Sequence, residues 1–184
     1  MSRLAFVLVA AAFLAPTVLG QGREDTQGAY SAVAMGTGGG VGGKSMQFDF
    51  RISTCTTDEE VDQLAALLKE KGPDGLRRAM EKLNVGRIRP TSSVGNQIAV
   101  ARKRQDGSNT VITVTARQMP FIELYRNGRT TDYPSGFLQV TLDEKSQGAG
   151  QIMAAAKIRF DKKKGHYEFE SYGNQYIKAV NVLP

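Results

Sequence analysis

The sequence predicts a mainly β domain of the α+β class, in which an antiparallel β-meander of about nine strands forms a barrel or a strongly curled sheet. Three observations lead to this prediction. Apolar and polar residues alternate with a period of two along most of the chain, which is typical of half-buried strands. Asp-Gly and Asn-Gly pairs at 106–107 and 127–128 are typical of hairpin turns. Between 58 and 83 the apolar residues recur at helical spacing, which predicts one helical hairpin inserted after the second strand.

Short connections join most of the predicted strands, so strands that are neighbours in sequence are expected to pair antiparallel. The alternation is clearest where Phe48, Phe50 and Ile52 are separated by polar residues. Closing the sheet into a barrel hides its edges, whereas an open sheet needs a cover, which the helical hairpin would supply. The predicted strands are 29–35, 46–52, 98–104, 110–117, 121–126, 137–142, 151–160, 167–172 and 176–183.

The helical hairpin is predicted from its cap and its break. Thr57 and Glu60 have the spacing of a capping box, so a helix is expected to begin at residue 58. Gly72 is expected to end this helix and Pro73 to start a second one, because proline is common at the first position of a helix. Apolar residues at helical spacing on both sides of the break, as far as Leu83, give each helix a face to bury.

The N-terminus has the layout of a signal peptide. Arg3 precedes an almost unbroken apolar run over 4–14, and small residues precede a plausible cleavage site before Gln21. This run is shorter than the ~20 apolar residues that a membrane-spanning helix needs, so no transmembrane anchor is expected after cleavage. We therefore expect export to the periplasm or full secretion. The expected organisation is a signal peptide at 1–20, a flexible leader at 21–28 and a single domain at 29–184 with a helical hairpin at 58–83.

The chain is basic, with a formal net charge of +6, which becomes +5 when Arg3 leaves with the signal peptide. A basic exported protein is suited to an anionic envelope component. Along 151–160 the even-numbered apolar residues are expected to share one face, with the cationic residues on the other. Ordinary solvated strand faces and turns are the alternative explanation for the charge. The residues predicted to form an anion-binding surface are Arg102, Arg104, Lys157 and Arg159.

Aromatic residues are concentrated in the meander. Inside a tightly packed barrel they would belong to the core, and in a roomier barrel they would line a pocket for a small, apolar, lipid-like ligand, with the helical hairpin as a lid. The candidate ligand-binding residues are Tyr125, Tyr133, Phe137, Tyr167 and Phe169.

A glycine-rich stretch from Gly38 to Ser45 matches the phosphate-binding loop pattern letter for letter. That loop works only when a helix begins at its Lys-Ser pair and directs backbone N–H groups at the phosphates. Here the residues that follow, 46–52, alternate as a strand. The match is therefore attributed to chance, and no nucleotide is expected to bind.

No catalytic, metal or cofactor site is predicted. His166, Glu168 and Glu170 share one face of a predicted strand, but neighbours on that face are about 6.6 Å apart, which is too wide for one ion without further ligands. Cys55 is the one cysteine of the chain, so an intramolecular disulfide is impossible. Burial of the thiol is expected rather than pairing between two chains.

Three stretches connect the chain to other proteins, namely Gly-Arg-Ile-Arg-Pro at 86–90, Thr-Asp-Tyr-Pro-Ser-Gly-Phe at 131–137 and Ala-Ala-Ala-Lys-Ile-Arg-Phe-Asp at 154–161. With them the chain resembles a group of short bacterial proteins that carry a signal peptide and have no assigned function. The resemblance spans most of the mature chain. It implies export and supplies no catalytic residue.

Three functions fit these observations. The first is a non-enzymatic exported domain that binds a small apolar ligand or an anionic envelope component. The second is a structural or assembly partner in a cell-surface complex. The third is an enzyme of unknown type, for which the sequence offers no constellation of catalytic spacing.

Overall fold

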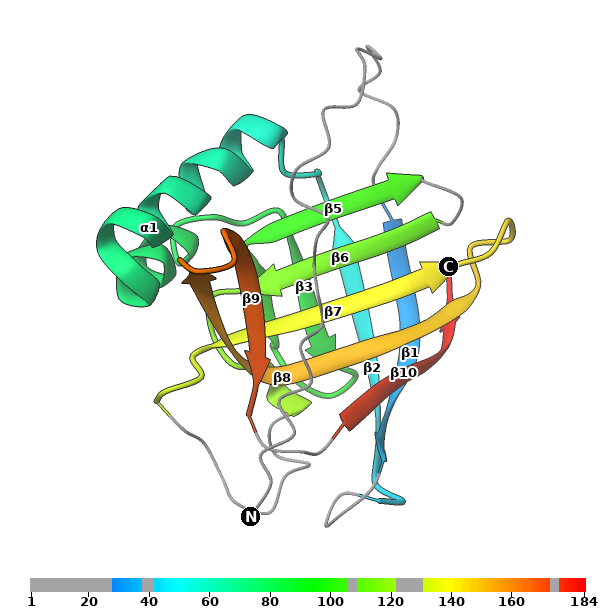
Figure 1. The fold of residues 1–184 in the computed structure, drawn as a ribbon. Helices are drawn as coiled ribbons and strands as arrows, with labels where there is room; N and C mark the ends of the chain where they lie inside the picture. The colour runs from blue at the N-terminus through cyan, green and yellow to red at the C-terminus, as the bar shows by residue number, and fades with distance from the viewer. Residues whose placement is uncertain (1–27, 38–41, 106–108, 122–130, 173–175) are drawn as a thin grey trace.

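The computed structural model describes residues 28–37, 42–105, 109–121, 131–172 and 176–184. Within them the chain forms ten strands and one helix (Figure 1). In chain order these are β1 (Gly28–Thr37), β2 (Ser45–Ile52), α1 (Asp58–Met80), β3 (Gly86–Pro90), β4 (Asn96–Ile98), β5 (Val100–Gln105), β6 (Asn109–Thr115), β7 (Ser135–Leu142), β8 (Gly148–Asp161), β9 (His166–Ser171) and β10 (Tyr176–Leu183).

The strands form a nearly closed antiparallel barrel. Their order is β4-β3-β2-β1-β10-β8-β7-β6-β5, and β9 lies off this path, paired with β8. The two end strands, β4 and β5, are consecutive in the chain and are separated by Ala99 alone. Because β4 pairs with β3 while β5 pairs with β6, one continuous run of chain borders both ends of the sheet. The predicted antiparallel, barrel-like sheet is confirmed.

Sequence neighbours do not always pair as predicted. β10 pairs with β1 and with the first part of β8, whereas the last part of β8 pairs with β9. Closure explains this arrangement, because β10 supplies the link between β1 and β8. The structure also contains β3 and β4, which are not among the predicted strands. The predicted strand at 121–126 lies outside the described residues except for Phe121.

The helical segment is a single helix, so the prediction of a helical hairpin over 58–83 is wrong. The predicted cap is present, because Thr57 Oγ1 accepts a hydrogen bond from the Glu60 N–H and Glu60 Oε2 accepts one from the Thr57 N–H. The predicted break is present only as a kink at Gly72, where φ is 68° and ψ is −171°. Reversing a helix needs a loop of about two to five residues. One non-helical residue before Pro73 therefore bends α1 without folding it back.

Two apolar clusters stabilise the fold. The first fills the inside of the barrel, where Phe48, Phe50 and Phe121 are fully buried and the rings of Phe48 and Phe121 meet edge to face at 4.8 Å. The second lies outside the barrel, between its wall and α1. Within the described residues no helix is both long and apolar enough to cross a membrane.

Candidate functional site

A β-bulge in β8 determines which side chains of this strand face α1 on the outside of the barrel. Phe137 of β7 pairs with Met153, but Ser135 pairs with Ala156, so β8 carries one extra residue between these two positions. Because side chains alternate along a strand, the extra residue exchanges the faces of β8 beyond it. Ile152 therefore belongs to the barrel core, whereas Ile158 packs in the outer cluster. The prediction that the even-numbered residues of 151–160 share one face is wrong for this reason.

Beyond the bulge, the β8–β9 hairpin presents an apolar face to α1. Tyr167 and Phe169 of β9 pack with Ile158 against the outer cluster. The ring of Phe169 packs against the ring of Phe137 of β7, and the two ring centroids are 4.7 Å apart. Three of the predicted ligand-binding aromatic residues are thus brought together, although on the outside of the barrel.

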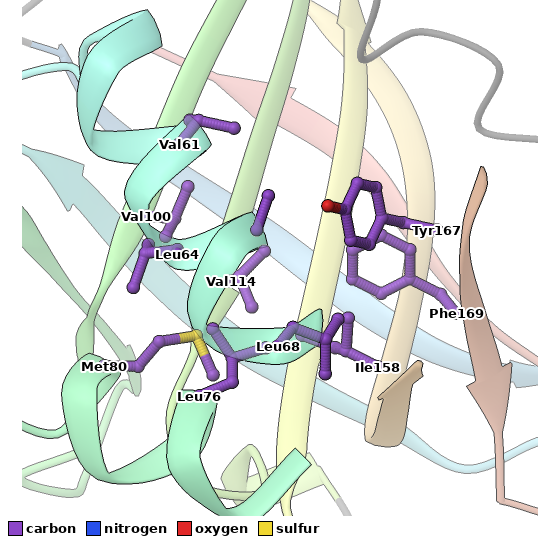
Figure 2. Close-up of a pocket in the computed structure, with 11 residues that line it drawn as sticks. Val61, Leu64, Leu68, Leu76, Met80, Val100, Val114, Ile158, Tyr167 and Phe169 are labelled. Carbon is purple, nitrogen blue, oxygen red and sulfur yellow. The ribbon is translucent and has the colours of Figure 1, made fainter. Parts of the chain in front are cut away.

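A small apolar cavity of about 60 Å³ lies between α1 and this wall (Figure 2). Helix residues form one side of it, and strands β5, β6, β8 and β9 form the other. Apart from the Tyr167 hydroxyl, the side chains around it carry no polar atoms, so water gains no partners there. The lining residues are Val61, Leu64, Ala65, Leu68, Leu76, Met80, Val100, Val114, Ile158, Tyr167 and Phe169.

Hydrogen bonds connect the residues that precede α1 to β5, which is one of the two end strands of the sheet. The N–H of Thr56 donates to the Ala101 carbonyl at 2.8 Å, and the Ala101 N–H donates back to Thr56 Oγ1 at 3.0 Å. Arg102 donates to the Thr56 carbonyl at 3.0 Å and forms an ion pair with Asp58. Arg102, predicted to belong to an anion-binding surface, thus contacts the start of the helix. Arg104 lies two residues further along β5.

Lys69 lies at the rim of the cavity. Its Nζ is 4.6 Å from the centroid of the Phe160 ring and 5.7 Å from that of Tyr167. The side chain is exposed on α1, and Tyr167 lines the cavity directly beside it. A cation therefore lies at the edge of an otherwise apolar pocket. The sequence shows Lys69 only as one of several polar helix residues, because its aromatic neighbours come from β8 and β9.

The other predicted residues lie apart from this cavity. Tyr133 packs against the barrel core beside Tyr172, with ring centroids 5.5 Å apart, and donates a 2.6 Å hydrogen bond to Glu170 Oε1. That hydrogen bond, together with partial burial, raises the pKa of the Tyr133 hydroxyl. Tyr125 lies outside the described residues.

Charges on the β8–β9 hairpin are paired with one another. Arg159 lies 3.5 Å from a Glu168 oxygen and 3.3 Å from a Glu170 oxygen, and Lys157 is directly opposite Glu170 in the register. Lys164 Nζ is 2.9 Å from Glu168 Oε1, and His166 Nε2 is 3.3 Å from the same oxygen. Arg159 and Lys164 thus pair with Glu168 and Glu170, the two carboxylates that the sequence places on one face. Within the described residues, no three His, Cys, Asp or Glu side chains are grouped to hold a metal ion.

Acidification is expected to weaken this hairpin through Glu168. The hydrogen bond from Lys164 is the main reason that the pKa of this carboxyl lies below its ordinary value of 4.5. A carboxyl with a lowered pKa contributes stability that is complete above the ordinary value and is lost as the pH falls through the lower one. Urea denaturation at pH 6 and at successive pH values below 4.5 should show a falling midpoint, and Glu168→Gln should flatten that fall.

The matched control for this pH series is Glu70→Gln, which removes a carboxylate from the exposed face of α1. We expect this variant to keep the pH dependence of the unaltered protein. Equal flattening by both substitutions would contradict the role assigned to Glu168.

Two other sequence features can now be placed. Ser45 starts strand β2 and not a helix, as predicted for the stretch that matches the phosphate-binding pattern, of which 38–41 lie outside the described residues. Cys55 is half-buried and packs against the barrel core. It lies near Tyr30, whose hydroxyl pKa is raised by burial and, to a smaller extent, by Cys55.

Comparison with known proteins adds no relative to this description. No family model, no curated protein and no solved structure matches the chain.

Proposed function

We propose that the protein is an exported binding domain that holds the alkyl chain of an anionic amphiphile between α1 and the barrel wall. The observation that carries the proposal is the apolar cavity under α1, which has a lysine at its rim. An alkyl chain gains free energy by leaving water for such a lining, at roughly 25 cal/mol per Å² of apolar surface. Lys69 supplies a positive charge for the head group at the point where the lining ends.

Binding requires α1 to move outward. With α1 in its observed position the cavity holds about 60 Å³, whereas ligand sites generally enclose about 300–1,000 Å³. Val61, Leu64 and Ala65 of the first helical segment are only half-buried, in contrast to Leu68, Leu76 and Met80 further along. Gly72 lies between the two segments of the kinked helix, 58–71 and 73–80. A residue at such a position is suited to absorb the change in φ and ψ of a hinge.

Export belongs to the same proposal and rests on the layout of residues 1–20 and on the resemblance to signal-bearing bacterial proteins. An extracytoplasmic domain of this kind meets lipids and their breakdown products. Native mass spectrometry of protein purified gently from the exported fraction tests both parts at once. We expect a chain that begins at Gln21 and that carries an adduct of lipid-like mass.

A defined probe tests the cavity itself. Sodium decanoate, titrated by calorimetry, is expected to bind the unaltered protein with a negative heat-capacity change, which is the signature of apolar burial. Ala65→Phe places a ring in the cavity and should abolish binding. Ala66→Phe adds the same ring on the exposed face of the next residue and should leave binding intact. Circular dichroism would establish that both variants are folded.

Lys69→Gln separates the head group from the chain. This variant should weaken decanoate about twofold to fivefold, as removal of one exposed ion pair predicts, and should leave the binding of uncharged decanol unchanged. Failure of decanoate to bind the unaltered protein, or equal loss in the Ala65 and Ala66 variants, would contradict the proposal.

A further inference from the structure

Three arginines project from the outer wall of the barrel, at a distance from the cavity under α1. Arg51 of β2 and Arg87 and Arg89 of β3 are exposed and alternate with residues buried in the barrel core. The pairing of β2 with β3 puts Arg51 directly opposite Arg87 and puts Asp49 directly opposite Arg89. The β1–β2–β3 wall thus carries three cationic side chains next to one carboxylate.

Asp49, the one carboxylate side chain among the residues that line this wall, is already engaged by other neighbours. Asp49 Oδ1 accepts a 3.1 Å hydrogen bond from Ser31 Oγ, and its Oδ2 lies 3.8 Å from Arg89 Nε. Arg87 donates to the Val94 carbonyl at 3.1 Å. In the part of the chain that the structure describes, no carboxylate lies within 4 Å of the guanidinium of Arg51 or of Arg87.

Like charges that face each other directly across two strands destabilise a sheet. The Arg51–Arg87 pair is therefore unfavourable unless an anion lies between the two guanidinium groups. The same wall is hollowed over a volume of about 640 Å³, which is within the range of small-molecule sites. Besides the charged residues, the lining of this hollow includes the polar residues Ser31, Ser53 and Asn84, and also Pro184, the last residue of the chain.

We propose that this hollow, here called the arginine hollow, binds the phosphoryl group of a small polar molecule. Guanidinium groups form paired, charge-assisted hydrogen bonds to phosphoryl oxygens, and Arg51 and Arg87 offer two such groups from adjacent strands. Arg89 adds a third cation whose charge is shared with Asp49. The hydroxyl and amide groups around the arginines suit a hydroxyl-bearing organic part.

The inference is independent of the amphiphile proposal, because the arginine hollow and the cavity under α1 have no lining residue in common. The test uses pyrophosphate and glucose 6-phosphate as probes, with glucose as the uncharged comparison, and titrates each by calorimetry at two salt concentrations. Both phosphorylated probes should bind the full chain and raise its melting temperature, and glucose alone should not.

Arg51→Gln and Arg87→Gln are each expected to weaken the phosphorylated probes about tenfold or more, as loss of a hydrogen bond to a charged group predicts. The matched control is Arg78→Gln, which removes the same charge from the exposed face of α1 and should leave the affinity nearly unchanged. Without any probe, Arg51→Gln should keep or raise the urea midpoint of unfolding, because it removes the unfavourable pair. A purely structural arginine would lower that midpoint.

The two probes distinguish the sources of the phosphoryl group. Tighter binding of glucose 6-phosphate would support an organic phosphate held also by Ser53 or Asn84, and equal binding would support recognition of the phosphoryl group alone. The inference would be overturned if the unaltered protein bound neither probe at about 10 mM, a concentration on the order of the Kd of the weakest specific complexes. Equal weakening by the Arg78 and Arg51 variants would also overturn it.

Discussion

Replacing Phe48 with alanine is expected to lower the free energy of unfolding by about 4 kcal/mol. Phe48 is 0% exposed in the middle of β2, and its ring meets Phe121 edge to face and lies 6.1 Å from Phe50. The substitution removes the buried ring and leaves a space that the surrounding strands fill only in part, since a barrel wall is held by hydrogen bonds on both sides. Urea denaturation followed by circular dichroism, extrapolated linearly to water, measures the loss.

Two variants bracket this result. Phe48→Leu keeps most of the buried volume and should cost clearly less than Phe48→Ala. Val94→Ala changes a side chain that is 78% exposed and should stay within about 0.5 kcal/mol of the unaltered protein. A loss below about 1.5 kcal/mol for Phe48→Ala would mean that the barrel interior is not the tightly packed core described above.

Local signals in the sequence predict the parts of the fold that depend on local interactions. The alternation around Phe48 predicts β2, and the Thr57–Glu60 spacing predicts the start of α1, because both depend on residues close in sequence. The course of the chain after Gly72 depends on how α1 packs against β8 and β9. A glycine followed by a proline is compatible with either a kink or a turn, so the sequence alone does not decide between them.

The candidate sites show the same limit. Tyr167 and Phe169 are identifiable as pocket residues by their type, but the bulge in β8 decides which face of the wall they join, and a bulge is a property of the pairing with β7. Arg51 is unremarkable in sequence as a polar residue of an alternating strand. Its significance appears only when the register with β3 puts it opposite Arg87.

The start of β8 is where the sequence is most misleading. The predicted strand at 151–160 begins three residues after the observed one, because Gly148 and Gly150 both belong to β8. Gly150 pairs with Val140 of β7 on one side and with Ala179 of β10 on the other. A Cβ at Gly150 would overlap the carbonyl oxygen of Gln139, which is a backbone atom that cannot rotate away.

Gly150→Ala is therefore expected to destabilise the protein by about 3 kcal/mol, at the upper end of typical overpacking costs. The matched control is Ala149→Val, which adds volume at the adjacent exposed position of the same strand and should be nearly neutral. Urea denaturation of the two variants measures the difference. If Gly150→Ala were as stable as the control, the close approach of β7 to β8 would be wrong. The pairing of β8 with β10, which connects β10 to the rest of the barrel, would then be wrong as well. A large loss confined to Gly150→Ala would mean that glycine at this position is a requirement of barrel closure.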